Sequence, residues 1–81
     1  MITVKLFARI REDLDCRELQ WTTAGSVRDL VSALGRERGG HWSDVLLAPQ
    51  VIVAINQQVG GLDSPLDDGD EVAFFPPVTG G

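Results

Sequence analysis

The sequence predicts a small α+β domain, in which a mixed sheet of about five strands packs on one main helix plus a short helix. Two-residue alternation of apolar side chains marks strands at both ends of the chain, and one stretch with helical periodicity lies between them. The 81 residues contain no internal repeat or linker, and 43% apolar with 23% charged residues is ordinary for a globular protein. A single domain is therefore expected.

The first strand is predicted over residues 2–10, where apolar and polar side chains alternate. One face should carry the core residues, namely Ile2, Val4, Leu6, Ala8 and Ile10. Phe7 falls on the outer face among polar neighbours. The charged residues 11–17 are expected to turn the chain, and residues 18–22 to form a second strand that completes an N-terminal hairpin.

The main helix is predicted to begin at Ser26, whose hydroxyl can accept a hydrogen bond from a backbone N–H of the first turn. Its buried stripe is formed by residues at helical spacing, namely Val27, Leu30, Val31 and Leu34. Gly39 is expected to end the helix in a left-handed cap. A short helical turn around Trp42, Val45 and Leu46 should follow and close over the core.

Three strands are predicted in the second half of the chain. The apolar run over residues 51–56 is typical of a central strand, residues 56–58 of a turn, and residues 59–61 of a brief edge strand. The last strand covers residues 71–75, with Val72 and Phe74 on one face and Ala73 and Phe75 on the other. This element order resembles that of the β-grasp, or ubiquitin-like, architecture. The resemblance implies that the first and last strands lie parallel at the centre of the sheet.

The formal net charge of −5 argues against partners that present phosphates, namely nucleic acids and anionic membranes. It favours encounter with a basic protein surface, although solubility explains the charge equally well. No apolar run approaches the roughly 20 residues of a membrane span. The first residues lack the basic start and apolar block of a signal peptide, so a cytoplasmic protein is expected.

The chain has one cysteine, Cys16, and one histidine, His41. This excludes an internal disulfide and a Cys/His zinc site, and no metal site is expected. The acidic residues around Cys16 should make its thiol less nucleophilic. No Walker loop, nucleophile elbow or dinucleotide fingerprint is present.

The last six residues, 76–81, are predicted to form a flexible C-terminal tail after a folded domain of residues 1–75. Pro76 and Pro77 have no N–H and fix φ, so they end the sheet and favour a stiff, extended exit. Val78 and Thr79 also prefer extended backbone, while Gly80 and Gly81 have no Cβ and could pass through a narrow tunnel. The carboxylate of Gly81 could then enter the active site of another protein.

A carboxylate becomes reactive when AMP is transferred to it from ATP, because the product is a mixed anhydride. A sulfur nucleophile could displace the AMP and leave a thiocarboxylate on Gly81. This chemistry needs no catalytic side chain from the chain itself, and the sequence offers no plausible Ser/His/Asp or Cys/His arrangement.

Phe7 and Phe75 are predicted to stand together on the outer face of the sheet, because their strands should be neighbours. Val59 on the edge strand could join them. An apolar patch at the root of the tail is typical of a docking surface, and two scattered surface aromatics are the competing interpretation.

The string of residues 68–81, DGDEVAFFPPVTGG, closely resembles the C-terminus of the small, sulfur-carrying subunit of molybdopterin synthase. Residues 53–57 resemble the central strand of that family, and residues 5–8 with Arg11 and Glu12 resemble its beginning. The match spans the chain in length and element order, whereas the segment from Cys16 to Pro49 is generic.

The resemblance implies that an E1-like enzyme adenylates Gly81 with ATP and that a sulfur-donating enzyme supplies the thiocarboxylate sulfur. The tail, Val78, Thr79, Gly80 and Gly81, would insert into the large subunit of the synthase, where the catalytic side chains are expected. Sulfur would pass to cyclic pyranopterin monophosphate and build the dithiolene that binds molybdenum. The family assembles as a heterotetramer, and Phe7, Val59 and Phe75 match its hydrophobic interface. No cofactor is expected on the chain itself.

Three other interpretations of the sequence remain open. The chain could carry sulfur for another pathway, such as thiamine, cysteine or tRNA thiolation. It could be a ubiquitin-like modifier joined to target lysines through Gly81. It could also be a plain interaction domain, in which case loss of Gly80 and Gly81 would be harmless.

Overall fold

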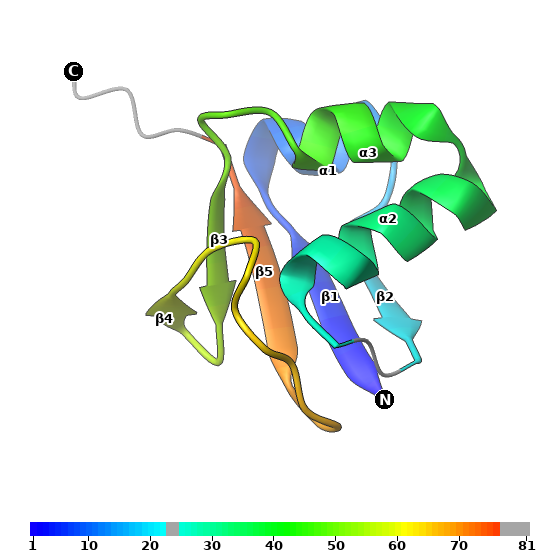
Figure 1. Ribbon diagram of the computed structural model, residues 1–81. Coiled ribbons are helices and arrows are strands. Elements are labelled where there is room, and N and C mark those ends of the chain that lie inside the picture. Colours follow the sequence, from blue (N-terminus) through cyan, green and yellow to red (C-terminus); the bar gives the residue numbers. More distant parts are fainter. Residues whose placement is uncertain (23–24, 77–81) are drawn as a thin grey trace, which may run out of the picture.

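The computed structural model describes residues 1–22 and 25–76 and has the predicted α+β architecture. A five-stranded mixed sheet lies against helices α2 and α3, which cover one of its faces (Figure 1). In chain order the elements are β1 (Ile2–Leu6), α1 (Ala8–Leu14), β2 (Glu18–Trp21), α2 (Val27–Arg38), α3 (Gly40–Leu46), β3 (Ile52–Ile55), β4 (Gln58–Val59) and β5 (Glu71–Phe75).

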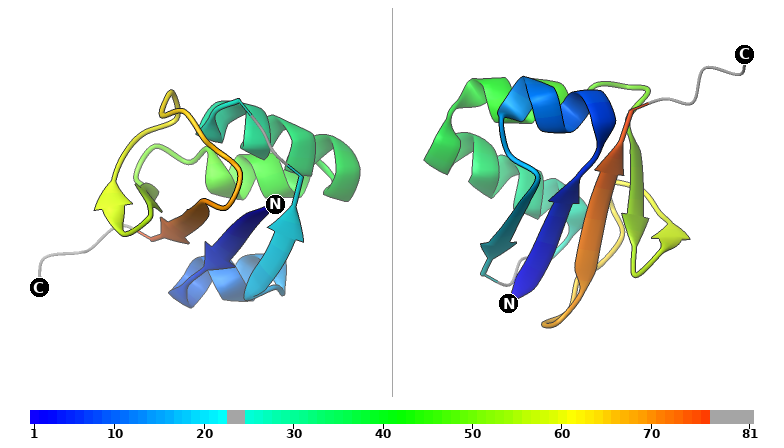
Figure 2. Two further views of the ribbon diagram at one scale, coloured as in Figure 1. Left: turned by 90° about the horizontal axis from the view of Figure 1, so that it is seen from below. Right: turned by 180° about the vertical axis from the view of Figure 1, so that it is seen from behind.

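The first and last strands run parallel to each other, side by side, as predicted for a β-grasp fold. The strand order is β2-β1-β5-β3-β4, so β5 is the central strand and β1 its neighbour. Thr3 pairs with Glu71 and Leu6 with Phe74, whereas the other three strand pairs are antiparallel. Because β1 and β5 point the same way, the carboxyl ends of both strands lie at the same end of the sheet (Figure 2, right).

The core lies between the sheet and the two covering helices. Val4 pairs with Val72, and alternate residues of both strands belong to the buried core, namely Ile2, Val4, Leu6, Val72 and Phe74. α2 contributes the four buried residues that the sequence predicted, and no polar or charged side chain of the described residues is buried. The largest fully buried side chains are Phe74, Ile2, Leu6, Leu30, Leu34, Leu46, Val4, Val27, Val31 and Val72. Burying an aliphatic or aromatic side chain stabilises a protein by about 1.5–3 kcal/mol, so these residues dominate the stability.

The prediction of a strand over residues 2–10 followed by a turn is wrong in its second half. β1 ends at Leu6, and residues Ala8–Leu14 form the helix α1, so β1 and β2 pair without forming a tight hairpin. Ile10 and Leu14 lie one helical turn apart and are both buried. α1 packs against α3, and the ring nitrogen Nε2 of His41 lies 3.1 Å from the carbonyl oxygen of Asp13.

The start of α2 is as predicted, because the Ser26 hydroxyl accepts a hydrogen bond of 3.2 Å from the Asp29 N–H. Its end differs. Gly39 has φ 112° and ψ 158°, which is a positive φ but not the left-handed helical cap that was expected. With this extended ψ, Gly39 ends α2 and also precedes α3, so it sets the angle between the two helices. The predicted short helix is confirmed as α3.

A two-residue turn joins β3 to β4 and is fixed by Asn56. Asn56 and Gln57 have positive φ values of 51° and 71°, as a type I′ hairpin turn requires, and β4 is shorter than predicted. The Asn56 side chain also reaches the beginning of β5. Its Nδ2 donates to Asp70 Oδ1 at 2.9 Å, and its Oδ1 accepts from the Glu71 N–H at 3.0 Å. Hydrogen bonds from the Asp67 N–H and from Asn56 hold the pKa of Asp70 below its usual value.

Within residues 1–22 and 25–76, no helix is both long enough and apolar enough to cross a membrane.

Replacing Asn56 by Ala should destabilise the domain by about 2 kcal/mol, measured as the free energy of unfolding in urea. The change removes two hydrogen bonds, each with a net contribution of about 0.5–1.5 kcal/mol, and places a Cβ-bearing residue at positive φ without side-chain compensation.

Asn56→Gly is the matched control, since glycine accepts the positive φ and isolates the loss of the hydrogen bonds. Its free energy of unfolding should fall between those of Asn56→Ala and the wild-type protein. Equal stability of all three proteins would show that this corner does not fix the position of β5.

Candidate functional site

The rings of Phe7 and Phe75 are stacked at the end of the sheet where β1 and β5 finish. Their centroids are 4.7 Å apart and their planes differ by 5°. Phe7 directly follows β1 and Phe75 is the last residue of β5, so the parallel pairing of these strands places the rings side by side. The Phe7 N–H donates to the Phe74 carbonyl at 3.2 Å and extends the pairing by one step. The predicted proximity of the two rings is confirmed.

A hollow opens beside the stacked rings on the face of the sheet opposite the helices. Two paired alanines, Ala54 and Ala73, form its floor. They are only 7% and 6% exposed although no helix covers them, because larger side chains surround them. The lining residues are Lys5, Phe7, Ala54, Gln57, Val59, Glu71, Ala73 and Phe75. We refer to these eight residues as the outer face.

The walls of the outer face have different chemistry. On one side Lys5 Nζ lies 2.9 Å from the Glu71 carboxylate, and this hydrogen bond together with the Glu71 charge raises the pKa of Lys5. On the other side stands Val59, which pairs with Ala54 and is 79% exposed. An ion pair therefore faces an aliphatic side chain across a floor of methyl groups.

The outer face is suited to receive an apolar side chain of another protein. Val59 and Phe7 are two of the four large hydrophobic residues of the described chain that are exposed, and Phe7 is 38% exposed. Apolar groups gathered around a depression and bordered by polar groups are typical of protein–protein contact sites. Neither ring has to move to open the hollow, so little ordering would accompany binding.

The outer face lies at the root of the chain's last segment. β5 ends at Phe75, and Pro76 follows as a half-buried residue. The predicted tail-insertion residues Val78, Thr79 and Gly80 and the predicted reactive residue Gly81 lie outside the described residues. Their roles stay predictions.

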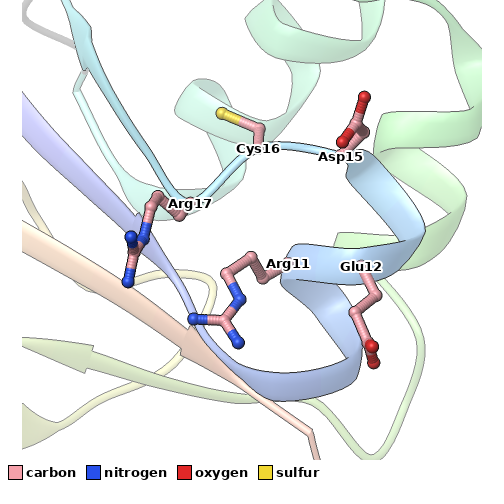
Figure 3. A pocket seen from close by; sticks show the side chains of 5 residues that line it. All are labelled: Arg11, Glu12, Asp15, Cys16 and Arg17. Atoms are coloured by element: carbon pink, nitrogen blue, oxygen red, sulfur yellow. The ribbon is translucent and has the colours of Figure 1, made fainter.

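The remaining candidates do not form a reactive site. Cys16 lines a second hollow with Arg11, Glu12, Asp15 and Arg17, and its thiol points away from both guanidinium groups (Figure 3). Its Sγ contacts the carbonyl oxygen of Glu18 at 3.6 Å, and the side chain packs against the core. Within the described part of the chain, no group of three or more His, Cys, Asp or Glu residues could hold a metal ion.

Four of the eight residues of the outer face, Phe7, Val59, Ala73 and Phe75, could be predicted from the sequence, and the other four could not. Ala54 lay inside an apolar run, where nothing distinguishes a core residue from an outward one. The signal that could have found it is its pairing with Val59 across the turn at Asn56, because paired residues share a face of the sheet. The ion pair of Lys5 and Glu71 also depends on the pairing of distant strands.

Comparison with known proteins shows the family to which this sequence is similar. The model of the ThiS family matches residues 4–81. Two curated proteins named "Molybdopterin synthase sulfur carrier subunit", from Haemophilus influenzae and Escherichia coli, are each 40% identical to the chain, and the match covers the whole of both proteins. "Small archaeal modifier protein 3" of Haloferax volcanii is 30% identical over 99% of the chain and 98% of that protein. The resemblance noted in the sequence is confirmed.

Solved structures agree with this relationship. The small archaeal modifier protein 1 of Methanosarcina acetivorans matches 99% of the chain and 95% of its own length, with a TM-score of 0.81 and 28% identity. A chain in a complex of subunits 1 and 2 of the molybdopterin-converting factor from Helicobacter pylori matches 99% of this chain and 97% of its own length, with a TM-score of 0.66 and 26% identity.

The stacked rings should stabilise each other. In a double-mutant cycle with Phe7→Leu and Phe75→Leu, the coupling energy in the free energy of unfolding should be about 0.5–1.5 kcal/mol, as for other aromatic pairs. Additive effects of the two substitutions would show that the rings do not interact in solution.

Proposed function

The chain belongs to the ThiS family, and from this premise we propose that it is the sulfur-carrier subunit of a molybdopterin synthase. The observation that carries the proposal is the 40% identity over the full length of two curated sulfur carrier subunits. The outer face agrees with it, because a docking surface at the end of β5 would hold a partner next to the segment that follows.

The proposed chemistry takes place at the main-chain carboxylate of Gly81. An oxygen of the carboxylate attacks the α-phosphorus of ATP on an E1-like activating enzyme, and pyrophosphate leaves. Hydrosulfide supplied by a donor enzyme then attacks the carbonyl carbon, the bond to the AMP oxygen breaks, AMP leaves, and a thiocarboxylate remains. In the large subunit the thiocarboxylate sulfur bonds to the molybdopterin precursor. Water then hydrolyses the acyl–sulfur bond, which leaves the sulfur on the precursor for the dithiolene and regenerates the carboxylate.

The described part of the chain is consistent with a carrier whose catalytic groups belong to its partners. Its only thiol contacts the backbone of Glu18, and its only imidazole contacts the backbone of Asp13. The two side chains therefore do not form a nucleophile and base pair. The domain would contribute a rigid platform and a docking surface.

We assign the outer face to the large subunit. A solved relative, the Helicobacter pylori protein, occurs in a complex of subunits 1 and 2 of the molybdopterin-converting factor. The stacked rings and Val59 would cover an apolar region of the large subunit, and the alanine floor would accept one protruding side chain. The tail would then enter the active site from this anchored base. The activating and sulfur-donating enzymes and a cytoplasmic location are further parts of the proposal.

A ubiquitin-like modifier is the second candidate, and a specific observation supports it. Small archaeal modifier proteins are among the relatives, and one of them is 30% identical to the chain. The relationship to sulfur carrier subunits is closer at 40% identity. A stable isopeptide bond between Gly81 and lysines of other proteins would favour the modifier.

Incubation with ATP, the activating enzyme and a sulfur source should increase the intact mass by one exchange of oxygen for sulfur. Mass spectrometry measures this, and fragmentation should place the change on Gly81. A protein extended by one residue after Gly81 should show no exchange, because its carboxylate is displaced along the tail. Sulfur incorporation in the extended protein would contradict the mechanism.

Phe7→Asp should weaken binding to the large subunit by at least tenfold, measured by calorimetry. A central aromatic anchor commonly contributes about 2 kcal/mol or more to binding, and a carboxylate in this position would also lose its hydration. The domain should remain folded, because Phe7 is partly exposed and lies outside the core, so that its free energy of unfolding falls only by the loss of the ring contact, about 0.5–1.5 kcal/mol.

Leu47→Asp is the matched control for this experiment. Leu47 is 42% exposed, close to the 38% of Phe7, but it follows α3 and does not line the outer face. Its substitution should leave the affinity near that of the wild-type protein. Equal weakening by both substitutions would mean that the outer face is not the specific contact.

A further inference from the structure

Two arginines beside the stacked rings have no acidic partner in the structure. Among residues 1–22 and 25–76, ion pairs involve Lys5, Arg9 and Arg28, and the guanidinium group of Arg38 lies 5.0 Å from the centre of the Trp42 ring. Arg11 and Arg17 are exposed and have no carboxylate oxygen within 4.0 Å in this part of the chain.

The two side chains belong to one surface. Arg11 is in the last turn of α1 and Arg17 immediately precedes β2. Both line the hollow of Figure 3, where their guanidinium groups lie on the same side of the connection between α1 and β2. Both also line an adjoining hollow together with Phe7, so this basic pair continues the outer face beyond the stacked rings.

Acidic side chains are also present around this pair, but they do not neutralise it by contact. Glu12 and Asp15 line one hollow and Glu18 lines the other, and none of these carboxylates lies within 4.0 Å of either guanidinium group. The nearest basic residue of the outer face, Lys5, is already paired with Glu71. Arginine is among the residues enriched at protein interfaces, and its planar group pairs with carboxylates through two hydrogen bonds.

Local structure explains only part of this arrangement. Arg11 stands at the carboxyl end of α1, where a positive charge favours the helix dipole. Arg17 follows α1 and contributes its backbone carbonyl to a hydrogen bond from the Leu6 N–H, which any residue could supply. Fold stability therefore does not require a cation at position 17.

We propose that Arg11 and Arg17 bind carboxylates on the large subunit and so orient the carrier when its outer face docks. This inference rests on the proposed function, since it assigns the same partner to an adjoining surface. The apolar outer face would supply most of the affinity, and the basic pair would accelerate association and fix the rotation of the carrier about the docking site. The large subunit should accordingly carry Asp or Glu residues beside the apolar region that receives Phe7.

The test measures association and dissociation rates of the large subunit with Arg11→Glu/Arg17→Glu by surface plasmon resonance. We expect association to slow by about tenfold or more at low ionic strength, with the difference shrinking as salt is added, because salt screens exposed charges. Arg11→Lys/Arg17→Lys keeps both charges and should associate at nearly the wild-type rate.

Arg36→Glu is the matched control for charge. Arg36 is exposed on α2, which covers the opposite face of the sheet, and it does not line either hollow. Arg36→Glu changes the net charge by the same amount as Arg17→Glu. Because Arg36 lies away from the proposed docking surface, association should slow markedly less than with Arg17→Glu alone.

The outcomes separate this inference from the function on which it rests. If wild-type protein binds and Arg17→Glu slows association no more than Arg36→Glu, the inference is overturned and the proposed function stands. If the double reversal impairs only thiocarboxylate formation by the activating enzyme, the inference is likewise overturned. Failure of the wild-type protein to bind the large subunit would overturn both.

Discussion

The parallel pairing of β1 with β5 is the constraint on which the rest of the structure depends. It joins residues from the two ends of the sequence, Thr3 with Glu71 and Leu6 with Phe74, in the middle of the sheet. Since the strands run in the same direction, the first residue after β1 and the last of β5 meet at one end. The stack of Phe7 on Phe75 is a direct consequence of this topology.

This arrangement gives the two faces of the sheet different tasks. The inner face, with Val4, Val72 and Phe74, is fully buried beneath the helices and makes the domain stable. The outer face has a floor of two alanines and taller side chains around it, and it remains available to a partner. Asn56 holds neighbouring strands of the sheet together, because its side chain is hydrogen-bonded from the β3–β4 turn to the beginning of β5. A small domain can thus hold a docking surface rigid next to its final segment.

Much of the fold could be predicted from the sequence because its signals are local. The alternation of residues 2–6, the Ser26 cap and the stripe from Val27 to Leu34 each lie within one element. The helix α1 was missed because Ala8 and Ile10 continue the alternation of β1, and seven residues are too few for helical periodicity to compete. The sequence signal that indicated this helix was the spacing of Ile10 and Leu14, which lie one helical turn apart.

The candidate site was harder to predict, because its parts come from distant positions. The prediction that Phe7 and Phe75 meet depended on the assumption that the terminal strands are neighbours, which the family resemblance supported. The register of the strands decides which way Ala54 points and whether Lys5 meets Glu71 and Asn56 meets Asp70. A shift of one residue would turn the side chains of a strand to the other face of the sheet. The roles proposed for positions 78–81 are supported by the sequence and its relatives alone.

In the proposed function, a folded platform presents a main-chain carboxylate to other enzymes. The most direct measurement is the activity of molybdenum-dependent enzymes in cells that lack their own sulfur-carrier subunit and express this protein in full or ending at Thr79. The full chain should restore activity, and the shortened chain, although folded and equally abundant, should not. Restored activity with the shortened chain would rule out this function for the carboxylate of Gly81.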